Sequence, residues 1–75
     1  QPLLVTLDPT DAPASLVTHA GQEFNLVLKG SVAVVFEDKE IILNEGDSIY
    51  FNPTYPHGQR CVGDSKARFL TVIAE

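Results

Sequence analysis

The chain has 75 residues, of which 44% are apolar, and it carries a net charge of −5 at neutral pH. This length allows one small domain, and the apolar share is typical of a globular protein rather than a disordered one. The acidic charge argues against direct binding of nucleic acid, because it repels phosphate groups, and no apolar run approaches the roughly 20 residues of a membrane span.

The chain contains one cysteine, Cys61, so it has no internal disulfide. This is typical of a reducing compartment, and we expect a cytoplasmic protein without a cysteine-rich zinc site. The first residue is Gln1, and no signal-peptide pattern follows it. We therefore expect residues 1–75 to be a single domain that belongs to a longer chain.

Eight strands are predicted in chain order, each a short run of aliphatic, β-branched or aromatic residues between turn residues. They cover residues 3–7, 15–19, 23–29, 32–36, 40–43, 48–51, 57–61 and 67–74. Gly30 and Gly46 are predicted to take positive φ at turns, and Gly30 is expected in a tight hairpin. No window of a dozen residues keeps a helical period free of glycine and proline. The pattern therefore predicts an all-β sandwich or barrel.

Several of these predicted strands are apolar on both faces, for example residues 26–28, 32–35 and 49–51. One face fills the interior, and a domain of this size has little of its own with which to cover the other. We therefore expect a homodimer, since two-fold pairing of identical copies is the commonest solution.

Two sets of spacings in the chain match a known pair of motifs. His19 precedes Glu23 by four residues, Glu23 precedes Gly30 by seven, and Gly46 precedes His57 by eleven. These spacings resemble the two motifs of the cupin family, and the resemblance spans essentially the whole chain. It implies a small double-stranded β-helix, which is a jelly-roll barrel.

The resemblance implies that His19, Glu23 and His57 converge inside the barrel. There they would hold a divalent metal ion (zinc, iron, manganese or nickel) or a ligand directly. Val17 stands where the family has its first histidine, so the fourth metal ligand is missing. The alternative is a hydrogen-bonded polar cluster without metal, in which the two imidazoles satisfy the carboxylate.

Residues next to these three share their strand faces, because alternate residues of a strand point the same way. Asn25 is predicted to lie on the face of Glu23, and Gln59 and Cys61 on the face of His57. Asn25 and Gln59 are therefore candidate ligand-binding residues. The alternatives are a solvent-facing Asn25 and a Gln59 satisfied by a neighbouring strand, and Cys61 is predicted to be a small buried hydrophobe.

A narrower resemblance is carried by "HAGQEFNLVLKG", "LNEGDSIYF", "PHGQ" and "ARFLTVI". These stretches are similar to the C-terminal cupin sensor domain of bacterial helix-turn-helix regulators of the Xre type. The resemblance implies binding of a small-molecule ligand here. Tyr50 and Tyr55 are candidates for gating the mouth of the barrel, and the more frequent alternative for aromatic residues at a rim is plain packing. The resemblance also implies that DNA is bound only by an upstream domain outside these residues.

The alternative function is a small metal-dependent cupin enzyme of the isomerase or dioxygenase type, which the same three residues would support. No serine lies in a nucleophile elbow, no glycine-rich phosphate loop is present, and no further acid–base residue is evident. The sequence therefore favours the sensor over the enzyme.

Overall fold

The computed structural model describes all 75 residues and contains strands but no helix. The strands are β1 (Pro2–Leu7), β2 (Gln22–Lys29), β3 (Ser31–Phe36), β4 (Glu40–Leu43), β5 (Ser48–Phe51), β6 (His57–Val62) and β7 (Ala67–Ala74). Two antiparallel sheets result, one with the strand order β1-β7-β2-β5 and the other with β4-β3-β6. The predicted small all-β jelly roll is confirmed, and no helix is present that could cross a membrane.

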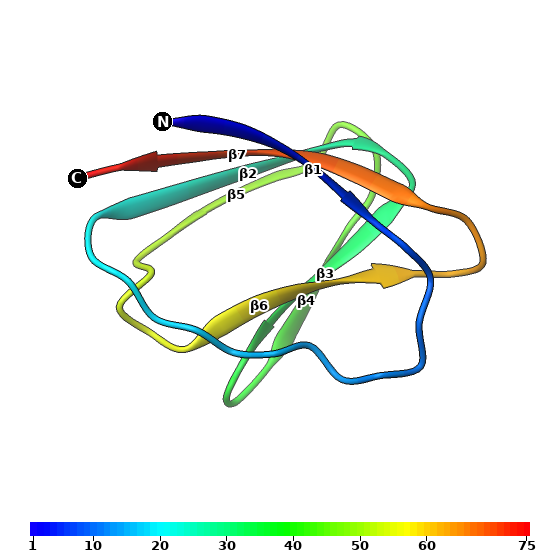
Figure 1. The fold of residues 1–75 in the computed structure, drawn as a ribbon, viewed down its shortest axis with the longest axis horizontal. Helices are drawn as coiled ribbons and strands as arrows, with labels where there is room; N and C mark the ends of the chain where they lie inside the picture. Colours follow the sequence, from blue (N-terminus) through cyan, green and yellow to red (C-terminus); the bar gives the residue numbers. More distant parts are fainter.

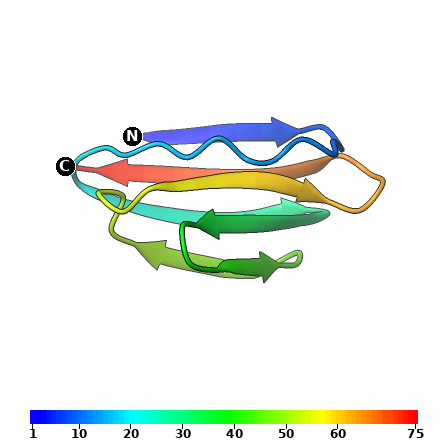
Figure 2. The same ribbon diagram turned by 90° about the horizontal axis from the view of Figure 1, so that it is seen from below.

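The two sheets form two layers whose inner faces meet in an apolar core (Figure 1). The strands of the four-stranded sheet run roughly along the longest axis of the molecule, whereas β3 and β4 run obliquely to it in Figure 1, and Figure 2 shows the same strands from below. Alternate residues of each strand point inward, which matches the two-residue period of the sequence. The buried core cluster consists of Val27, Val32, Val34, Leu43, Cys61, Ala67 and Phe69.

Three strands, β2, β6 and β7, carry inward residues that are polar toward one end and apolar toward the other. The polar ones are Glu23, Asn25, His57, Gln59 and Thr71, and all except the half-buried Gln59 are buried. Because the three strands bring their polar ends together, the interior is divided lengthwise into an apolar core and a polar cluster.

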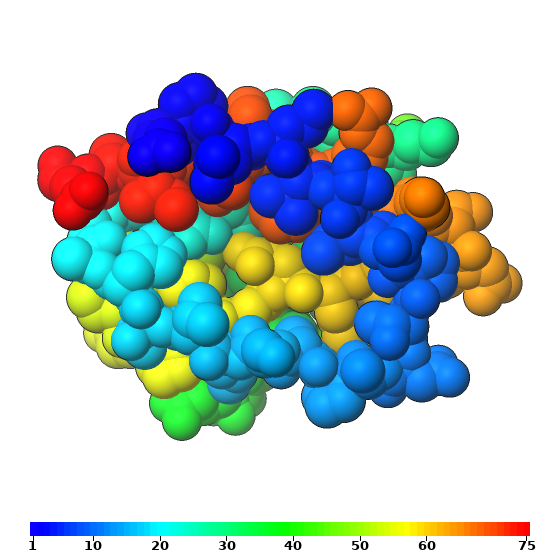
Figure 3. Space-filling model, in the orientation of Figure 1, coloured from blue at the N-terminus to red at the C-terminus, as the bar shows by residue number.

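The predicted strand over residues 15–19 is wrong. Only Val17 pairs with a strand, through an isolated bridge to His57 in which each backbone amide donates to the other's carbonyl. The backbone of Ser15 passes so close to Gly58 that a side chain at Gly58 would collide with the Ser15 carbonyl oxygen. The segment therefore runs antiparallel to β6 at close range without forming a ladder with it, and Figure 3 shows it on the near face beside β6.

The predicted hairpin at Gly30 is also wrong, although its positive φ of 74° is confirmed. Strand β2 pairs with β5 and β7, whereas β3 pairs with β4 and β6, so the turn at Gly30 takes the chain from one sheet to the other. Hydrogen bonds near the end of β2 explain why β2 pairs with β5 rather than with β3. The Val27 amide donates to the Asp47 carbonyl, and the Gly46 amide, at a φ of 84°, donates to the Val27 carbonyl.

Candidate metal centre

Three residues from different parts of the chain meet at the polar end of the interior. His19 lies on the segment that precedes β2, Glu23 lies near the start of β2, and His57 is the first residue of β6. The His19 amide donates to the Pro53 carbonyl at 3.0 Å, and the Val17–His57 bridge lies two residues before it. These backbone bonds hold the irregular segment against β6, and so they place His19 beside the two residues on strands.

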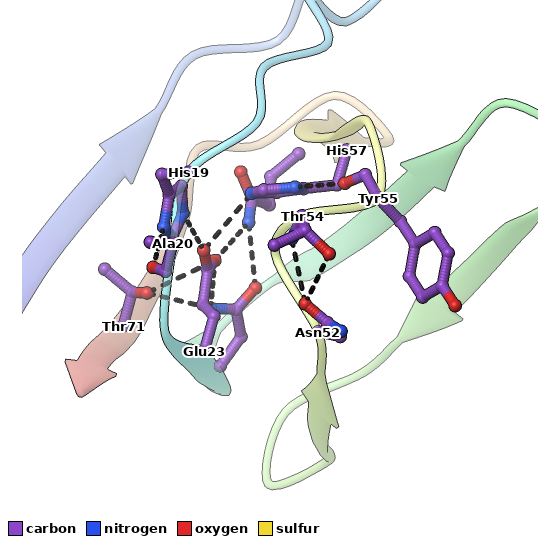
Figure 4. A network of polar contacts seen from close by, with 10 residues as sticks. His19, Ala20, Glu23, Asn52, Thr54, Tyr55, His57 and Thr71 are labelled. Atoms are coloured by element: carbon purple, nitrogen blue, oxygen red, sulfur yellow. Dashed lines mark hydrogen bonds and ion pairs between the residues drawn. The ribbon is translucent and has the colours of Figure 1, made fainter. Parts of the chain in front are cut away.

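The side chains of the three residues converge on one carboxylate oxygen (Figure 4). His19 Nε2 lies 2.8 Å from Glu23 Oε1, and His57 Nε2 lies 3.2 Å from the same oxygen. One ligand-type atom from each of the three residues falls within 4.8 Å of the others. Glu23 and His57 are buried, and His19 is about a third exposed, so the cluster is open to solvent only on the His19 side.

The other nitrogen of each imidazole faces a backbone carbonyl. His19 Nδ1 lies 3.1 Å from the Ala20 oxygen, and His57 Nδ1 lies 2.8 Å from the Tyr55 oxygen. A carbonyl oxygen only accepts, so Nδ1 carries the hydrogen in both rings. In the neutral form of each ring, Nε2 then presents a lone pair toward Glu23 Oε1. Three acceptors therefore point at one place, and either a proton on a ring nitrogen or a bound cation must satisfy them.

The second oxygen of the Glu23 carboxylate is occupied by donors from three strands. Asn25 Nδ2 and Gln59 Nε2 each donate to Oε2 at 3.0 Å, and the Thr71 hydroxyl donates at 3.4 Å. Asn25 Nδ2 also donates to the Thr71 hydroxyl, and Gln59 Nε2 donates to Asn25 Oδ1. This network fixes the plane of the carboxylate and leaves only Oε1 facing the histidines.

The electrostatics of the cluster favour an ionised Glu23. Burial by itself raises the pKa of the Glu23 carboxyl, because it removes water from the charged form. Hydrogen bonds from Asn25 and His19, together with positive charge on His57 and His19, outweigh that effect and hold the pKa below its ordinary value. The carboxylate is therefore charged at neutral pH, as a metal ligand must be.

The structure brings most of the residues singled out in the sequence into this cluster. Asn25 is buried beneath Glu23, and Gln59 lies on the same inward face of β6 as His57, so both join the network. The expectation of a solvent-facing Asn25 is excluded. Cys61 lies in the apolar core, where its thiol donates to the Ser65 carbonyl, in agreement with the prediction.

The structure also places Val17, which the sequence excludes as a ligand, and one residue that sequence reasoning did not identify. Val17 is 54% exposed and lies outside the set of three, although its backbone pairs directly with His57. Thr71 was not identified in the sequence. Its only signal was its place on the inward face of a predicted strand, and the β2–β7 register that sets it opposite Asn25 involves residues 46 positions apart.

Comparison with known proteins agrees with the geometry. A family model described as "Cupin domain" matches residues 3–73, which is nearly the whole chain. The chain belongs to the cupin family. No curated protein sequence matches this cupin domain.

Solved structures similar to this cupin domain include both enzymes and a regulator. Hydroxypropylphosphonic acid epoxidase (HppE) from S. wedmorenis, in complex with fosfomycin, has 28% identity and a TM-score of 0.87 over 97% of this chain and 42% of its own. FeII HppE has 31% identity and a TM-score of 0.86 over 97% and 41%. An HTH_3 family transcriptional regulator from Vibrio cholerae has 27% identity and a TM-score of 0.83 over 99% and 42%. This cupin domain spans less than half the length of each.

The donor set of the cluster fits a divalent transition metal. Two imidazole nitrogens and one carboxylate oxygen are ligands that iron, zinc and manganese accept, and three protein ligands leave further positions open. The two Nδ1–H groups bonded to carbonyls, and the donors behind Glu23, are the outer hydrogen bonds that orient such ligands in metalloproteins. The cupin domain can therefore hold a metal ion at His19, Glu23 and His57.

Proposed function

We propose that His19, Glu23 and His57 bind a divalent metal ion. The observation that carries the proposal is the convergence of two Nε2 lone pairs and one carboxylate oxygen, with both Nδ1 atoms already engaged by carbonyls. The rival arrangement is a protonated imidazole that donates to Glu23, with no metal. Both arrangements satisfy the three acceptors, so a measurement of the affinity of the protein for metal ions distinguishes them.

The test is metal retention after dialysis, measured by elemental analysis and by calorimetric titration with zinc, iron(II) and manganese. His57→Ala removes one of three ligands, and we expect affinity to fall by more than about 100-fold. Cys61→Ala removes the chain's single cysteine from the apolar core and should leave the affinity unchanged. If the parent protein binds no metal, or if Cys61→Ala matches His57→Ala, the proposed metal site is wrong.

We further propose that this cupin is the small-molecule-sensing domain of a helix-turn-helix transcriptional regulator. Support comes from the similarity to the Vibrio cholerae HTH_3 family regulator over 99% of this chain. The polar cluster adds to it, because outside the three ligands its members are Asn25, Gln59 and Thr71, none of which transfers protons at neutral pH. In this proposal a ligand binds at or beside the metal centre, and an upstream domain binds DNA.

The second candidate is a metal-dependent enzyme, which the similarity to HppE favours. Solved HppE structures contain FeII or CoII and include complexes with substrate. The three protein ligands would leave metal positions open for a substrate. The whole enzyme is more than twice as long as this cupin domain, so an equivalent activity would also require residues outside the chain.

Two experiments on the full-length parent protein separate the candidates. A sensor binds an operator fragment from its own upstream region, and substitution of His57 by Ala changes ligand control of that binding without abolishing it. An enzyme of the HppE type turns over hydroxypropylphosphonic acid when loaded with iron(II) and supplied with a two-electron oxidant such as hydrogen peroxide, and phosphorus NMR would detect the epoxide. Absence of sequence-specific DNA binding would contradict the sensor, and absence of turnover would contradict an epoxidase.

A further inference from the structure

A cavity of about 600 Å³ lies beside the metal centre but is separate from it. It opens between the turn that joins β3 to β4 and the chain from β5 into the loop before β6, and none of His19, Glu23 and His57 lines it. Its apolar residues are Phe36, Ile41, Ile49 and Phe51, which pack against the hydrophobic core. This volume is in the range of roughly 300–1,000 Å³ found for small-molecule sites.

Phe51 separates the cavity from the metal centre. Its ring lies edge-on to the His57 imidazole at 5.0 Å and edge-on to Phe36 at 5.3 Å. Tyr55 also contributes to both sides, since its carbonyl accepts from His57 Nδ1 while its ring is turned away from the polar cluster, as Figure 4 shows. The cavity is therefore a distinct site that shares a wall with the metal centre, and Phe36, which pairs with His57 across the sheet, belongs to the same wall.

Aromatic rings and carboxylates surround the cavity. Tyr50 and Tyr55, which are 63% and 65% exposed, stand at its rim, together with Glu37 and Asp38 from the β3–β4 turn. With the rings of Phe36 and Phe51, the cavity has four aromatic residues and two carboxylates. Aromatic faces attract organic cations, and carboxylates add longer-range attraction of the same sign.

Lys39 shows that this environment accepts a positive charge. Its ammonium nitrogen lies 5.9 Å from the centre of the Phe36 ring, at the edge of the same cavity. Even with Lys39 counted, Glu37 and Asp38 leave the lining with a net negative charge, and the chain as a whole carries −5. An anionic ligand would be repelled by the negative lining of the cavity and by the negative charge of the whole chain.

We propose that this cavity binds a small organic cation, an ammonium that carries alkyl groups. The alkyl groups contact Phe36, Ile41 and Ile49, the charged nitrogen lies against aromatic faces, and Lys39 competes with it for the Phe36 ring. This site goes beyond the proposed function and does not depend on a metal. Binding is accordingly expected in protein treated with a chelator as well as in protein loaded with metal.

The cupin domain carries its own reporter for this cavity. It contains no tryptophan and two tyrosines, and both tyrosines line the cavity. Tyrosine fluorescence therefore comes only from residues of this lining, and a fixed protein concentration keeps pairing of the outer sheet face, where Tyr50 also lies, constant during the titration. Choline serves as the probe, and 3,3-dimethyl-1-butanol, in which carbon replaces the charged nitrogen, serves as its uncharged isostere.

We expect saturable quenching or enhancement with choline, and binding of the isostere at least about fivefold weaker. Lys39→Met removes the internal competitor and should tighten choline binding about two- to fivefold. Lys66→Met makes the same charge change beside Asp8, away from the cavity, and should leave the affinity as it is. Ile41→Phe fills the cavity and should abolish binding, with an unchanged circular dichroism spectrum showing that the variant is folded.

Three results would overturn the proposal. They are a fluorescence response to choline that does not saturate, equal affinity for choline and its isostere, and equal effects of Lys39→Met and Lys66→Met. If Ile41→Phe fails to fold, the carbon-13 shifts of the Ile41 and Ile49 methyl groups in the parent protein replace it. Those shifts must then move with choline and saturate at the same concentration as the fluorescence.

Discussion

At the scale of single residues, the Glu23 carboxylate shows how hydrogen bonds orient a side chain that can bind a metal ion. Donors from Asn25, Gln59 and Thr71 engage one oxygen, and the other faces His19 and His57. A buried charge without such donors would be strongly unfavourable, so the network is what permits an ionised carboxylate at this depth. The donors thus serve the metal centre without touching the metal position.

This arrangement predicts the effect of Gln59→Ala. The change removes a donor from Glu23 Oε2 and leaves Asn25 Oδ1 without its partner, so we expect about 1–3 kcal/mol of destabilisation. Metal affinity should fall by roughly 10- to 100-fold, because the carboxylate loses an orienting bond. Gln22→Ala, at an exposed position of β2, is the matched control and should change neither thermal unfolding nor calorimetric metal affinity.

A second residue-scale prediction concerns Val17→His. Val17 and His57 exchange both backbone hydrogen bonds, and directly paired residues of antiparallel strands carry their side chains on the same face. A histidine at position 17 should therefore reach the centre as a fourth ligand and increase metal retained after dialysis. Thr18→His adds the same group to the adjacent residue. Equal retention in both variants would show that residue 17 does not face the site.

At the scale of elements, the segment between β1 and β2 is held by β6 rather than by a ladder of its own. It contributes His19 to the centre, and its close contact with β6 occurs at Gly58, where a side chain would collide with the Ser15 backbone. The absence of a side chain at Gly58 therefore determines how near the segment, and with it His19, lies to Glu23 and His57.

Gly58→Ala should displace this segment. We expect a loss of about 1–3 kcal/mol in the free energy of unfolding, as for other overpacked positions, together with weaker metal binding because His19 moves. Gly63→Ala is the control, since its φ of 91° makes the substitution unfavourable but no atom lies within 4 Å of the added group. Both variants should unfold at lower temperature, and only Gly58→Ala should lose metal affinity. Retained affinity in Gly58→Ala would refute this account of the segment.

At the scale of the whole molecule, the outer face of the four-stranded sheet is apolar and uncovered. Cross-strand partners align its side chains in two rows, and Leu4 and Tyr50 are more than half exposed. The rows consist of Pro2, Val72, Phe24 and Tyr50, and of Leu4, Leu70, Leu26 and Ser48. With strands about 4.8 Å apart and residues rising about 3.3 Å, these two rows on four strands cover roughly 250 Å².

We expect this face to pair with a second copy of the cupin domain. Two such faces bury roughly 500 Å² in total, so we expect a weak dimer that forms only at high protein concentration. Sedimentation at tens of micromolar should show a species of twice 8.2 kDa. Leu4→Glu, which places a charge on the face, should shift the population to monomer, whereas Leu16→Glu, on the segment before β2, should not. If the unsubstituted cupin domain sediments only as a monomer at these concentrations, the pairing is contradicted.

The sequence by itself determined the local features of this cupin domain. Two-residue periodicity and turn residues specified all seven strands to within one residue at each end, with one extra strand at residues 15–19, and showed that His57, Gln59 and Cys61 share a face. Positive φ at Gly30 and Gly46 followed from their places in turns. The resemblance of the motif spacings to those of cupins implied that His19, Glu23 and His57 meet, and the structure brings them together.

Only the tertiary structure decided which strands became neighbours. The turn at Gly30 looked like a hairpin, yet it changes sheets, because β2 gains its hydrogen bonds from β5 and β7. Residues 15–19 have strand composition, yet only one of them pairs, because Gly58 admits their backbone at close range. Thr71 beneath Glu23 and the cavity beside Phe51 likewise depend on contacts between residues far apart in the chain. Local propensity acts within a few residues, whereas register and sheet membership depend on the packing of the whole chain.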